Sequence, residues 1–340
     1  MVNLGDLTLG ELKSYIKEIG EAAFRADQIY KWVHSGIESF DEMTNISQKL
    51  KEKLSESFEV FIPEVYKKYV SKLDGTVKYL FKLSDGNIIE AVVMDYHHGK
   101  SICVSSQVGC RMGCSFCAST LNGLARNLTP FEIEGQIIRA QKDMNIRISS
   151  IVIMGIGEPL DNFTNVINFI RNTSSEKGLN IGFRHITLST CGLADKIYDL
   201  ADCDLPINLA ISLHAPTDER RKALMPVAKA YSIKALMEAC DYYYDKTHRR
   251  ITFEYALVKD KNSTPEDART LSRLLRGKNC HINLIPVNPV KERENERISK
   301  QDMDIFKKIL EENKINATVR RELGRDINAS CGQLRNQELN

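Results

Sequence analysis

The sequence lacks the features that mark exported and membrane-spanning proteins. Its first six residues, Met1 to Asp6, contain neither the basic segment nor the apolar core of a secretory signal peptide. No apolar run approaches the ~18 residues that a membrane-spanning helix requires. Internal repeats and low-complexity segments are also missing. These absences predict a cytoplasmic protein without a membrane partner.

The composition is that of an ordinary globular chain, with one exception in its cysteines. The 340 residues are 42% hydrophobic and 27% charged, which suits one large domain or two. A disulfide framework is not indicated, because the nine cysteines are an odd number without regular pairing. In a reducing compartment, clustered thiols indicate metal binding or catalysis instead.

Net charge is small but unevenly distributed along the chain. The whole chain carries +2, yet residues 1–60 hold 7 Lys and Arg against 11 Asp and Glu, so this part carries −4 and the rest +6. Basic groups recur at Arg220–Lys222, Arg249–Arg250 and Arg320–Arg321. A polyanionic partner would use such groups to contact phosphates, but an ordinary solvated surface explains them equally well.

The hydrophobic pattern separates two parts at the beginning of the chain. Residues 1–62 are predicted to form a small helical domain, because apolar residues such as Leu12 and Ile16 recur at helical spacing. Residues 63–100 contain alternating runs with turn signals such as Asp85–Gly86 between them, which predicts a linking β-meander.

Residues 101–340 alternate short β-rich runs with helical stretches. This order implies parallel strands with right-handed crossovers. About six such units are fewer than a full eight-fold barrel has, so an α/β fold with a partial (βα)6 barrel is predicted, its chemistry at the C-terminal ends of the strands. The predicted strands are 102–105, 150–154, 185–189, 207–213, 251–257, 281–286 and 317–322, and the predicted helices are 130–144, 162–173, 233–244, 265–276 and 300–312.

Three cysteines in one loop constrain the function most tightly. Cys110, Cys114 and Cys117 are spaced C-x3-C-x2-C directly after the first predicted barrel strand. Three thiolates at this spacing can hold three corners of a cubane iron–sulfur cluster, and without a fourth cysteine nearby one iron stays open to a ligand. A structural zinc site would call for paired C-x2-C knuckles and a fourth ligand. Three merely packed cysteines would be unusual in a loop punctuated by glycine.

This loop resembles the signature of the radical S-adenosylmethionine superfamily, in which an aromatic residue, here Phe116, precedes the last cysteine. The segment Met154–Pro159, after the second barrel strand, is similar to that superfamily's "GGEP" motif. Further stretches resemble one branch, the RlmN family, and the resemblance spans nearly the whole chain. These stretches are 103–110, 188–190, 212–216, 286–289 and 331–334.

The resemblance implies a radical S-adenosylmethionine barrel with two cofactors. One is a 4Fe–4S cluster held by the three loop cysteines, and the other is S-adenosylmethionine, which chelates the open iron. The residues that it implies for binding S-adenosylmethionine are Gly157, Glu158, Ser189, Ser212, Leu213, His214 and Asn288.

The RlmN family methylates C2 of adenine 2503 in 23S rRNA and, in some members, C2 of adenine 37 in tRNA. That carbon is electron-poor, so it cannot attack a methyl sulfonium but can be attacked by a carbon radical. By resemblance, Cys331 accepts a methyl group from a first S-adenosylmethionine and, after activation by a second, forms a thioether tether to C2. Cys103 is implied as the resolving thiol, which forms a disulfide with Cys331, and Glu90 as the acceptor of the C2 proton.

Glu90 has a simpler interpretation from spacing alone. It shares a strand face with Ile88 and Val92, where a carboxylate is either at an exposed sheet edge or has a pKa raised by burial. The spacing favours the edge, whereas the resemblance favours a buried base.

Two other functions compete with this one. A related enzyme of the same superfamily methylates C8 of adenine with the same cluster and the same two reactive cysteines. A different class altogether would be an RNA-binding module stabilised by zinc. For the favoured function, the expected partners of a monomeric chain are 23S rRNA, tRNA and an electron donor such as flavodoxin.

Overall fold

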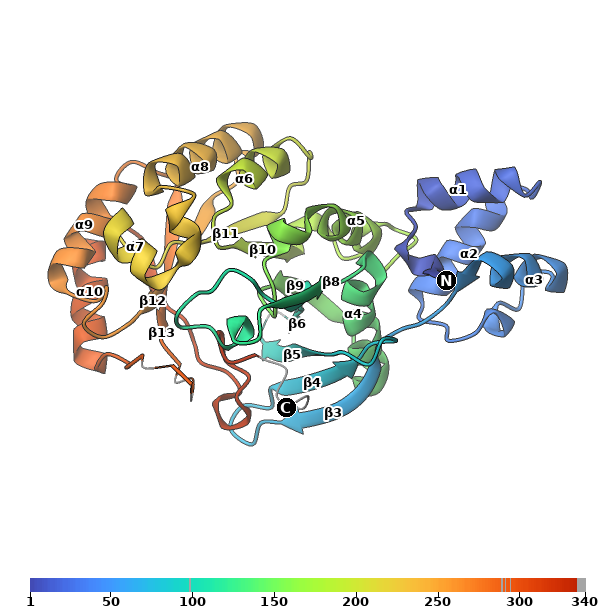
Figure 1. Cartoon of the computed structure of the whole chain (residues 1–340), viewed down its shortest axis with the longest axis horizontal. Helices are drawn as coiled ribbons and strands as arrows, with labels where there is room; N and C mark the ends of the chain where they lie inside the picture. Colours follow the sequence, from blue (N-terminus) through green and yellow to red (C-terminus); the bar gives the residue numbers. More distant parts are fainter. Residues whose placement is uncertain (98, 289, 291, 294, 335–340) are drawn as a thin grey trace.

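The computed structural model describes residues 1–97, 99–288, 290, 292–293 and 295–334. Within these residues, a ten-stranded mixed sheet forms the body of the molecule, and a helical module lies at one end (Figure 1). None of the described helices is both long and apolar enough to cross a membrane.

The N-terminal module has its own hydrophobic core, which includes Leu12 and Ile16 as the helical spacing predicts. Two residues of the barrel, the aromatic Phe131 and the aliphatic Ile138, complete this core. His34 Nδ1 lies 2.7 Å from the Glu134 carboxylate across the same boundary, with both side chains buried. The helices and strands of the N-terminal module are β1 (Val2–Asn3), α1 (Leu9–Glu18), α2 (Phe24–His34), α3 (Gln48–Ser57) and β2 (Phe58–Glu59).

The predicted meander is present, but it is a continuation of the main sheet. β4 and β5 pair antiparallel around the turn at Asp85–Gly86, as predicted, and β5 pairs with β6. β3 was not expected from the sequence. Because β5 lies between two strands, the sheet-edge interpretation of Glu90 is wrong. These strands are β3 (Glu64–Val70), β4 (Val77–Lys82), β5 (Ile88–Tyr96) and β6 (Gly99–Cys103).

The partial barrel is confirmed. In the described residues, β6 and the five strands β9 to β13 are each followed by a helix, and β14 ends the parallel series. The strands after β6 are β9 (Ile148–Ile153), β10 (Ile186–Thr190), β11 (Asn208–Ser212), β12 (Ile251–Leu257), β13 (Cys280–Pro286) and β14 (Ala317–Val319). The covering helices are α4 (Pro130–Met144), α5 (Phe163–Ser174), α6 (Ala194–Ala201), α8 (Ile233–Thr247), α9 (Pro265–Leu275) and α10 (Lys300–Glu312).

The sequence patterns did not predict some of the short elements. They are α6 itself, α7 (Asp218–Leu224) and a small hairpin of β7 (Gln107–Gly109) and β8 (Leu124–Asn127). α7 is too short to display an amphipathic period clearly. The hairpin brackets the cysteine loop, and Cys110 N donates to the Gly123 carbonyl at 2.8 Å between its strands.

The two faces of the sheet differ in polarity. Ile102, Ile151 and Leu188 point to the outer face and pack in the main core beneath the helices. The neighbouring positions point inward, and they include Cys103, Thr187 and Ser189. Side chains alternate along a strand, so residues one apart lie on opposite faces. The inner face thus provides the polar walls of the candidate site.

Candidate active site

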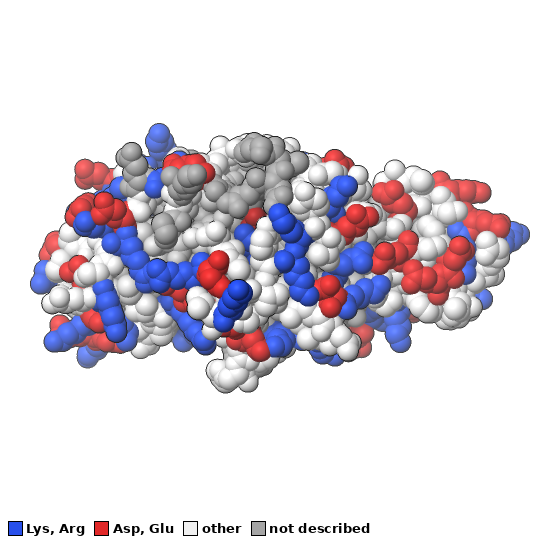
Figure 2. Space-filling model, turned by 90° about the horizontal axis from the view of Figure 1, so that it is seen from below, with Lys and Arg blue, Asp and Glu red and all other residues white. Residues whose placement is uncertain are grey.

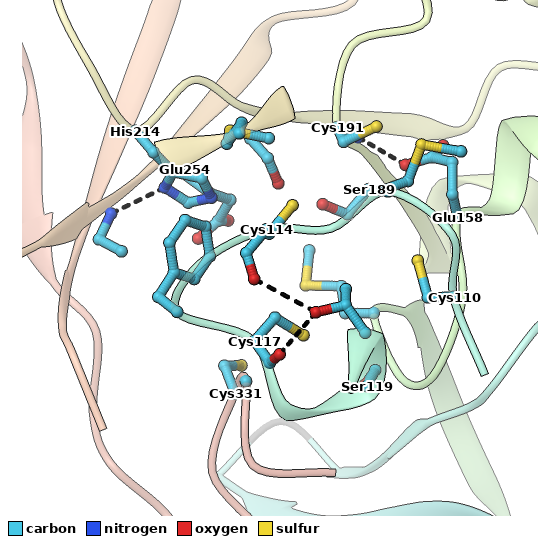
Figure 3. Close-up of a pocket in the computed structure, with 18 of the residues that line it drawn as sticks. Cys110, Cys114, Cys117, Ser119, Glu158, Ser189, Cys191, His214, Glu254 and Cys331 are labelled. Atoms are coloured by element: carbon cyan, nitrogen blue, oxygen red, sulfur yellow. Dashed lines mark hydrogen bonds between the residues drawn. The ribbon is translucent and has the colours of Figure 1, made fainter. Parts of the chain in front are cut away.

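One cavity lies where the barrel strands end, and the three loop cysteines line it. Figure 3 shows Cys110, Cys114 and Cys117 around this cavity, with Cys331 on the side of Cys117. The sequence prediction that the loop opens at the C-terminal ends of the strands is therefore confirmed for all three cysteines.

The cysteine loop is held by hydrogen bonds from several elements. Ser115 N donates to the Leu224 carbonyl at 2.9 Å, and Asn295 Nδ2 donates to the Ser115 carbonyl at 2.8 Å. The Thr120 hydroxyl donates to the carbonyls of Cys117 at 3.0 Å and Cys114 at 3.3 Å. Backbone and side-chain hydrogen bonds of the protein thus hold the loop geometry.

Burial keeps the three thiols protonated in the absence of a metal. Desolvation, reinforced by Cys117, raises the pKa of Cys110 to about 12, and it raises the pKa of Cys114 and Cys117 as well. A metal ligand must be a thiolate, so iron would displace these protons on binding. Soft thiolates are the ligands that iron–sulfur clusters use.

The donor set suits a cluster spread over several irons. In the described part of the chain, no three Cys, His, Asp or Glu side chains converge on the position of a single metal ion. A cubane cluster binds each cysteine to a different iron, so it requires thiols distributed around a cavity, which is the arrangement of Cys110, Cys114 and Cys117. The residues therefore fit the 4Fe–4S cluster that the spacing predicts.

The loop after β9 forms the next wall of the cavity. Gly157 has φ +112°, and a Cβ there would lie 2.7 Å from the Gln107 Cβ, so only glycine fits. Glu158 is buried, and its two carboxylate oxygens accept from Leu160 N at 3.0 Å and Cys191 N at 2.6 Å. Burial raises the pKa of Glu158, although these amides favour the ionised form. Glu158 thereby fastens the β9 loop to the end of β10.

The other residues predicted to bind S-adenosylmethionine occupy the same cavity, with one exception. Ser189, Ser212, His214 and Asn288 line it. The side chain of Leu213 lies in the main hydrophobic core instead. Pro289, which completes the motif at 286–289, lies outside the described residues.

His214 is a neutral, buried part of the wall. Its Nδ1 accepts from Ala256 N at 2.8 Å, and its ring meets Phe116 edge-on with centroids 4.7 Å apart. Burial and the nearby Arg221 lower the pKa of His214 to about 3. A neutral imidazole can accept this hydrogen bond, whereas a protonated one cannot.

Cys331 lies at the cavity on a segment bound to the cysteine loop. Ala118 N donates to the Gly332 carbonyl at 2.8 Å, and the Ser119 hydroxyl donates to the Leu334 carbonyl at 2.7 Å. Asn288 Nδ2 donates to the Cys331 carbonyl at 3.0 Å. The chain therefore brings its C-terminal cysteine to the loop that is expected to hold the cluster.

Cys103 and Glu90 lie on the inner face of the sheet and are not among the residues that line the cavity. Cys103 is the cross-strand partner of Val92, and Glu90 is two residues from Val92 on the same face. Cys103 packs with Leu323 and other residues of the C-terminal segment, and both Cys103 and Glu90 are buried. Burial and the proximity of Cys331 raise the pKa of Cys103 to about 12. Cys103 thus lies near Cys331, and Glu90 lies on the same sheet face as Cys103.

Sequence reasoning missed three residues of the cavity wall. Cys191 is a buried residue that also lines the cavity. Buried Glu254 and half-buried Arg320 form an ion pair with 3.4 Å between Nη1 and Oε2, and Arg320 lies near Cys331 and Cys103. A carboxylate at an inward position of β12 was the available signal for Glu254.

Comparisons with protein families cover both parts of the chain. Residues 2–60 match the ribosomal RNA large subunit methyltransferase N-terminal domain, and residues 104–274 match the radical SAM superfamily. Proteins from Lachnoclostridium phytofermentans and Clostridium beijerinckii, each called "Probable dual-specificity RNA methyltransferase RlmN", are 55% identical to this chain. The alignments cover 98% of this chain and 94% of the first relative, and 100% of this chain and 96% of the second.

Solved structures agree with these relatives. A radical SAM methyltransferase from Sphaerobacter thermophilus is 40% identical with a TM-score of 0.93, over 99% of this chain and 100% of that one. Streptococcus suis SuiB bound to S-adenosylmethionine is 16% identical over 65% of this chain and 50% of that one, with a TM-score of 0.50, and shares the fold alone. The matches along both parts of its length show that this chain belongs to the RlmN family of the radical S-adenosylmethionine superfamily.

Proposed function

We propose that this protein methylates C2 of adenine in RNA, at position 2503 of 23S rRNA and position 37 of tRNA. The observation that carries the proposal is the convergence of two cysteines from distant parts of the chain. Cys331 lies at the cavity that the cluster cysteines line, and Cys103 lies close to Cys331 beneath the C-terminal segment. The relatives named as dual-specificity RNA methyltransferases support both kinds of RNA as substrate.

The cofactors supply a reaction that side chains cannot perform. When bound, the 4Fe–4S cluster delivers one electron to S-adenosylmethionine and provides a radical that abstracts hydrogen from a methyl group. A donor of single electrons, which we propose to be a flavodoxin-type protein, must reduce the cluster. Cys110, Cys114 and Cys117 would hold the cluster. S-adenosylmethionine would be bound by the wall residues Gly157, Glu158, Ser189, Ser212, His214 and Asn288, together with the backbone at Leu213.

The structure refines what individual wall residues would contribute. Both oxygens of Glu158 are engaged by backbone amides, so Glu158 would orient the backbone around Gly157 as well as supply negative charge near an ammonium group. The side chain of Leu213 is buried, so its contribution would come from the backbone. Asn288 would position Cys331 through the bond to its carbonyl.

Three side chains would carry the methyl group from sulfur to carbon. The Cys331 sulfur accepts a methyl group, and after loss of one hydrogen atom its methylene carbon bonds to C2. The unpaired electron that this bond leaves on the adenine ring would return to the oxidised cluster. Glu90 then takes the C2 proton. Cys103 attacks the Cys331 sulfur, the sulfur–methylene bond breaks, and the departing carbon takes up a proton to become the methyl group. The Cys103–Cys331 disulfide left behind must be reduced by an external thiol before the next turnover.

The charge distribution supports an RNA substrate for the larger part of the chain. Figure 2 shows acidic side chains gathered on the N-terminal module and basic side chains spread over the rest of the visible face. The barrel and meander carry the excess of positive charge counted from the sequence. Lys and Arg are the residues that contact RNA phosphates.

We propose the division into an accessory domain at 1–62, a linking meander at 63–100 and a catalytic barrel at 101–340.

Isotopic labelling of the methyl group tests the proposal. The anaerobically purified holoenzyme is given reductant, S-adenosylmethionine with a trideuterated methyl group, and 23S rRNA fragments or tRNA. Nucleoside mass analysis is expected to yield 2-methyladenosine whose methyl group has two deuterium atoms, since one is abstracted and replaced from solvent. Formation of 8-methyladenosine, or retention of all three deuterium atoms, would overturn it. A colourless protein that holds zinc would instead support the RNA-binding module.

A further inference from the structure

The β3–β4 hairpin is attached to the segment that carries Cys331. The Ser71 hydroxyl donates to the Asp326 carboxylate at 2.6 Å, and Lys72 N donates to the same carboxylate at 2.9 Å. Gly324 N donates to the Asp74 carboxylate at 2.9 Å. These contacts join the hairpin turn to a segment only a few residues before Cys331, so the hairpin helps to set the path of the chain into the cavity.

One side chain of this hairpin reaches further inward. Lys78 lies on β4 and is only 4% exposed, which is unusual for a lysine. Its Nζ lies 3.4 Å from the Glu90 carboxylate and donates to the Asn328 carbonyl at 3.3 Å. The ammonium group also lies 5.6 Å from the centre of the Tyr69 ring. Lys78 therefore contacts both the proposed base and the Cys331 segment.

The sheet register places Lys78 in line with the reactive groups. Its partner across β4 and β5 is Val92, and the partner of Val92 across β5 and β6 is Cys103. Directly opposed residues lie on the same face, so Lys78, Glu90 and Cys103 share the inner face of the sheet. Lys78 therefore lies between the proposed base, Glu90, and the segment that carries Cys331.

Burial explains why such a lysine would be retained at this position. A buried ammonium group is tolerated only when it is paired and hydrogen-bonded. Here the partners are the Glu90 carboxylate and the Asn328 carbonyl, which are fixed to different parts of the chain. A cation between them restricts the rotamers of Glu90 and keeps its carboxylate on the Cys331 side of the strand.

We propose that Lys78 is a positioning residue for the release step, which holds the Glu90 carboxylate against the segment that carries Cys331. The inference rests on the proposed function. In that step the tethered adenine has already given up the unpaired electron left by the radical addition. Its C2–H bond then breaks, the electron pair of that bond returns to the ring, and the proton goes to Glu90. Lys78 would act through its contacts with Glu90 and the Asn328 carbonyl. Its effect is to keep Glu90 within reach of the proton while the thioether tether exists.

The test compares Lys78→Met with Lys82→Met in the full-length holoenzyme. Lys82 lies on the same strand and the same face, but it is exposed. Each variant is given reductant, S-adenosylmethionine and RNA, and the protein–RNA adduct is quantified by denaturing gel. We expect Lys78→Met to carry at least 10-fold more adduct than wild type, because addition to C2 needs no base. Lys82→Met is expected to carry the same amount of adduct as wild type. In both variants, the Cys331 peptide of the isolated protein is expected to have its wild-type mass.

Two further variants separate the possible outcomes. Lys78→Arg keeps a cation and is expected to bring the adduct level most of the way back to that of wild type. A role of Lys78 in packing alone would not predict this rescue. If Lys78→Met does not fold, the adduct level of Lys78→Arg tests the inference. Equal adduct levels in Lys78→Met and Lys82→Met, or no rescue by Lys78→Arg, would overturn the inference. Cys103→Ala is run in parallel. If Cys103→Ala accumulates the adduct and Lys78→Met does not, only the role of Lys78 is refuted. If neither variant accumulates the adduct, the proposed function itself is refuted.

Discussion

The two groups of cysteines around the cavity are held in contrasting ways. Cys110, Cys114 and Cys117 lie within eight residues of one loop, whose geometry is maintained by hydrogen bonds to its own backbone and its neighbours. Cys103 and Cys331 come from the first barrel strand and the C-terminal segment, and only tertiary contacts bring them together. The first group needs a local spacing, whereas the second needs the whole fold.

This difference matches the work that each group is proposed to do. A cluster has a fixed size, so its ligands can be specified by a short motif. A thiol that carries a methyl group must meet a cofactor, a base and a resolving thiol in turn, so it benefits from a segment tied at several points. Cys331 is tied through Asn288, Ala118 and Ser119, and the chain before it through Lys78.

Removal of a cluster ligand should have the largest effect. Cys114→Ala leaves two thiols for three iron corners, and we expect it to lose both the iron and all methylation. Iron and sulfide analysis with the visible absorption spectrum of the anaerobic protein measures the first, and nucleoside mass analysis measures the second. Full iron content in Cys114→Ala would contradict the assignment of this loop.

Removal of the methyl-carrying thiol should separate the two groups. Cys331→Ala is expected to retain wild-type iron content, because Cys331 belongs to the other group, and yet to form no methylated adenine. Methylated RNA from Cys331→Ala would show that the methyl group travels by another route. The wild-type protein isolated from cells should show one extra methyl mass on the peptide that contains Cys331.

Removal of the resolving thiol should stop the reaction one step later. Cys103→Ala is expected to retain iron and to accumulate RNA bound through Cys331, because the tether forms but no thiol cleaves it. Mass analysis after ribonuclease digestion measures the adduct on the Cys331 peptide. Free RNA alone, with normal iron content, would remove Cys103 from the second group.

A change in the β9 loop should weaken cofactor binding without abolishing chemistry. Glu158→Gln loses one of the two oxygens that accept from Leu160 N and Cys191 N. A buried amide left without a partner costs about 1–3 kcal/mol. We expect the KM for S-adenosylmethionine to rise about 10-fold, which corresponds to about 1.4 kcal/mol, with iron content unchanged. An unchanged KM would show that the backbone of the loop is held without Glu158.

A cysteine that belongs to neither group provides the smallest effect. Cys240 lies on the buried face of α8, in the main hydrophobic core, and does not line the cavity. Cys240→Ala is expected to lower the free energy of unfolding by about 1 kcal/mol, a typical value for a core truncation of this size. Denaturant unfolding measures this loss, and iron content and methylation should stay at wild-type levels. Loss of iron from Cys240→Ala would indicate that Cys240 contributes to the cluster site.

Much of the fold followed from the sequence because its elements obey strong local patterns. The predicted barrel strands at 150–154 and 251–257 match β9 and β12 closely, and the predicted helix at 130–144 matches α4. β3 was missed because its side chains are mostly exposed and show no hydrophobic alternation. α6 and α7 were missed because short helices leave few residues on which a period can be recognised.

The sequence by itself determined the three-cysteine loop, the alternation of strands and helices, and the resemblance that links Cys331 to Cys103. Tertiary structure alone decided that Glu90 is an interior residue, that Glu158 binds backbone amides, and that Lys78 is buried between Glu90 and the Cys331 segment. The physical reason is range. Spacing specifies what lies within a few residues, whereas burial and ion pairing depend on strands that the sheet brings together from distant parts of the chain.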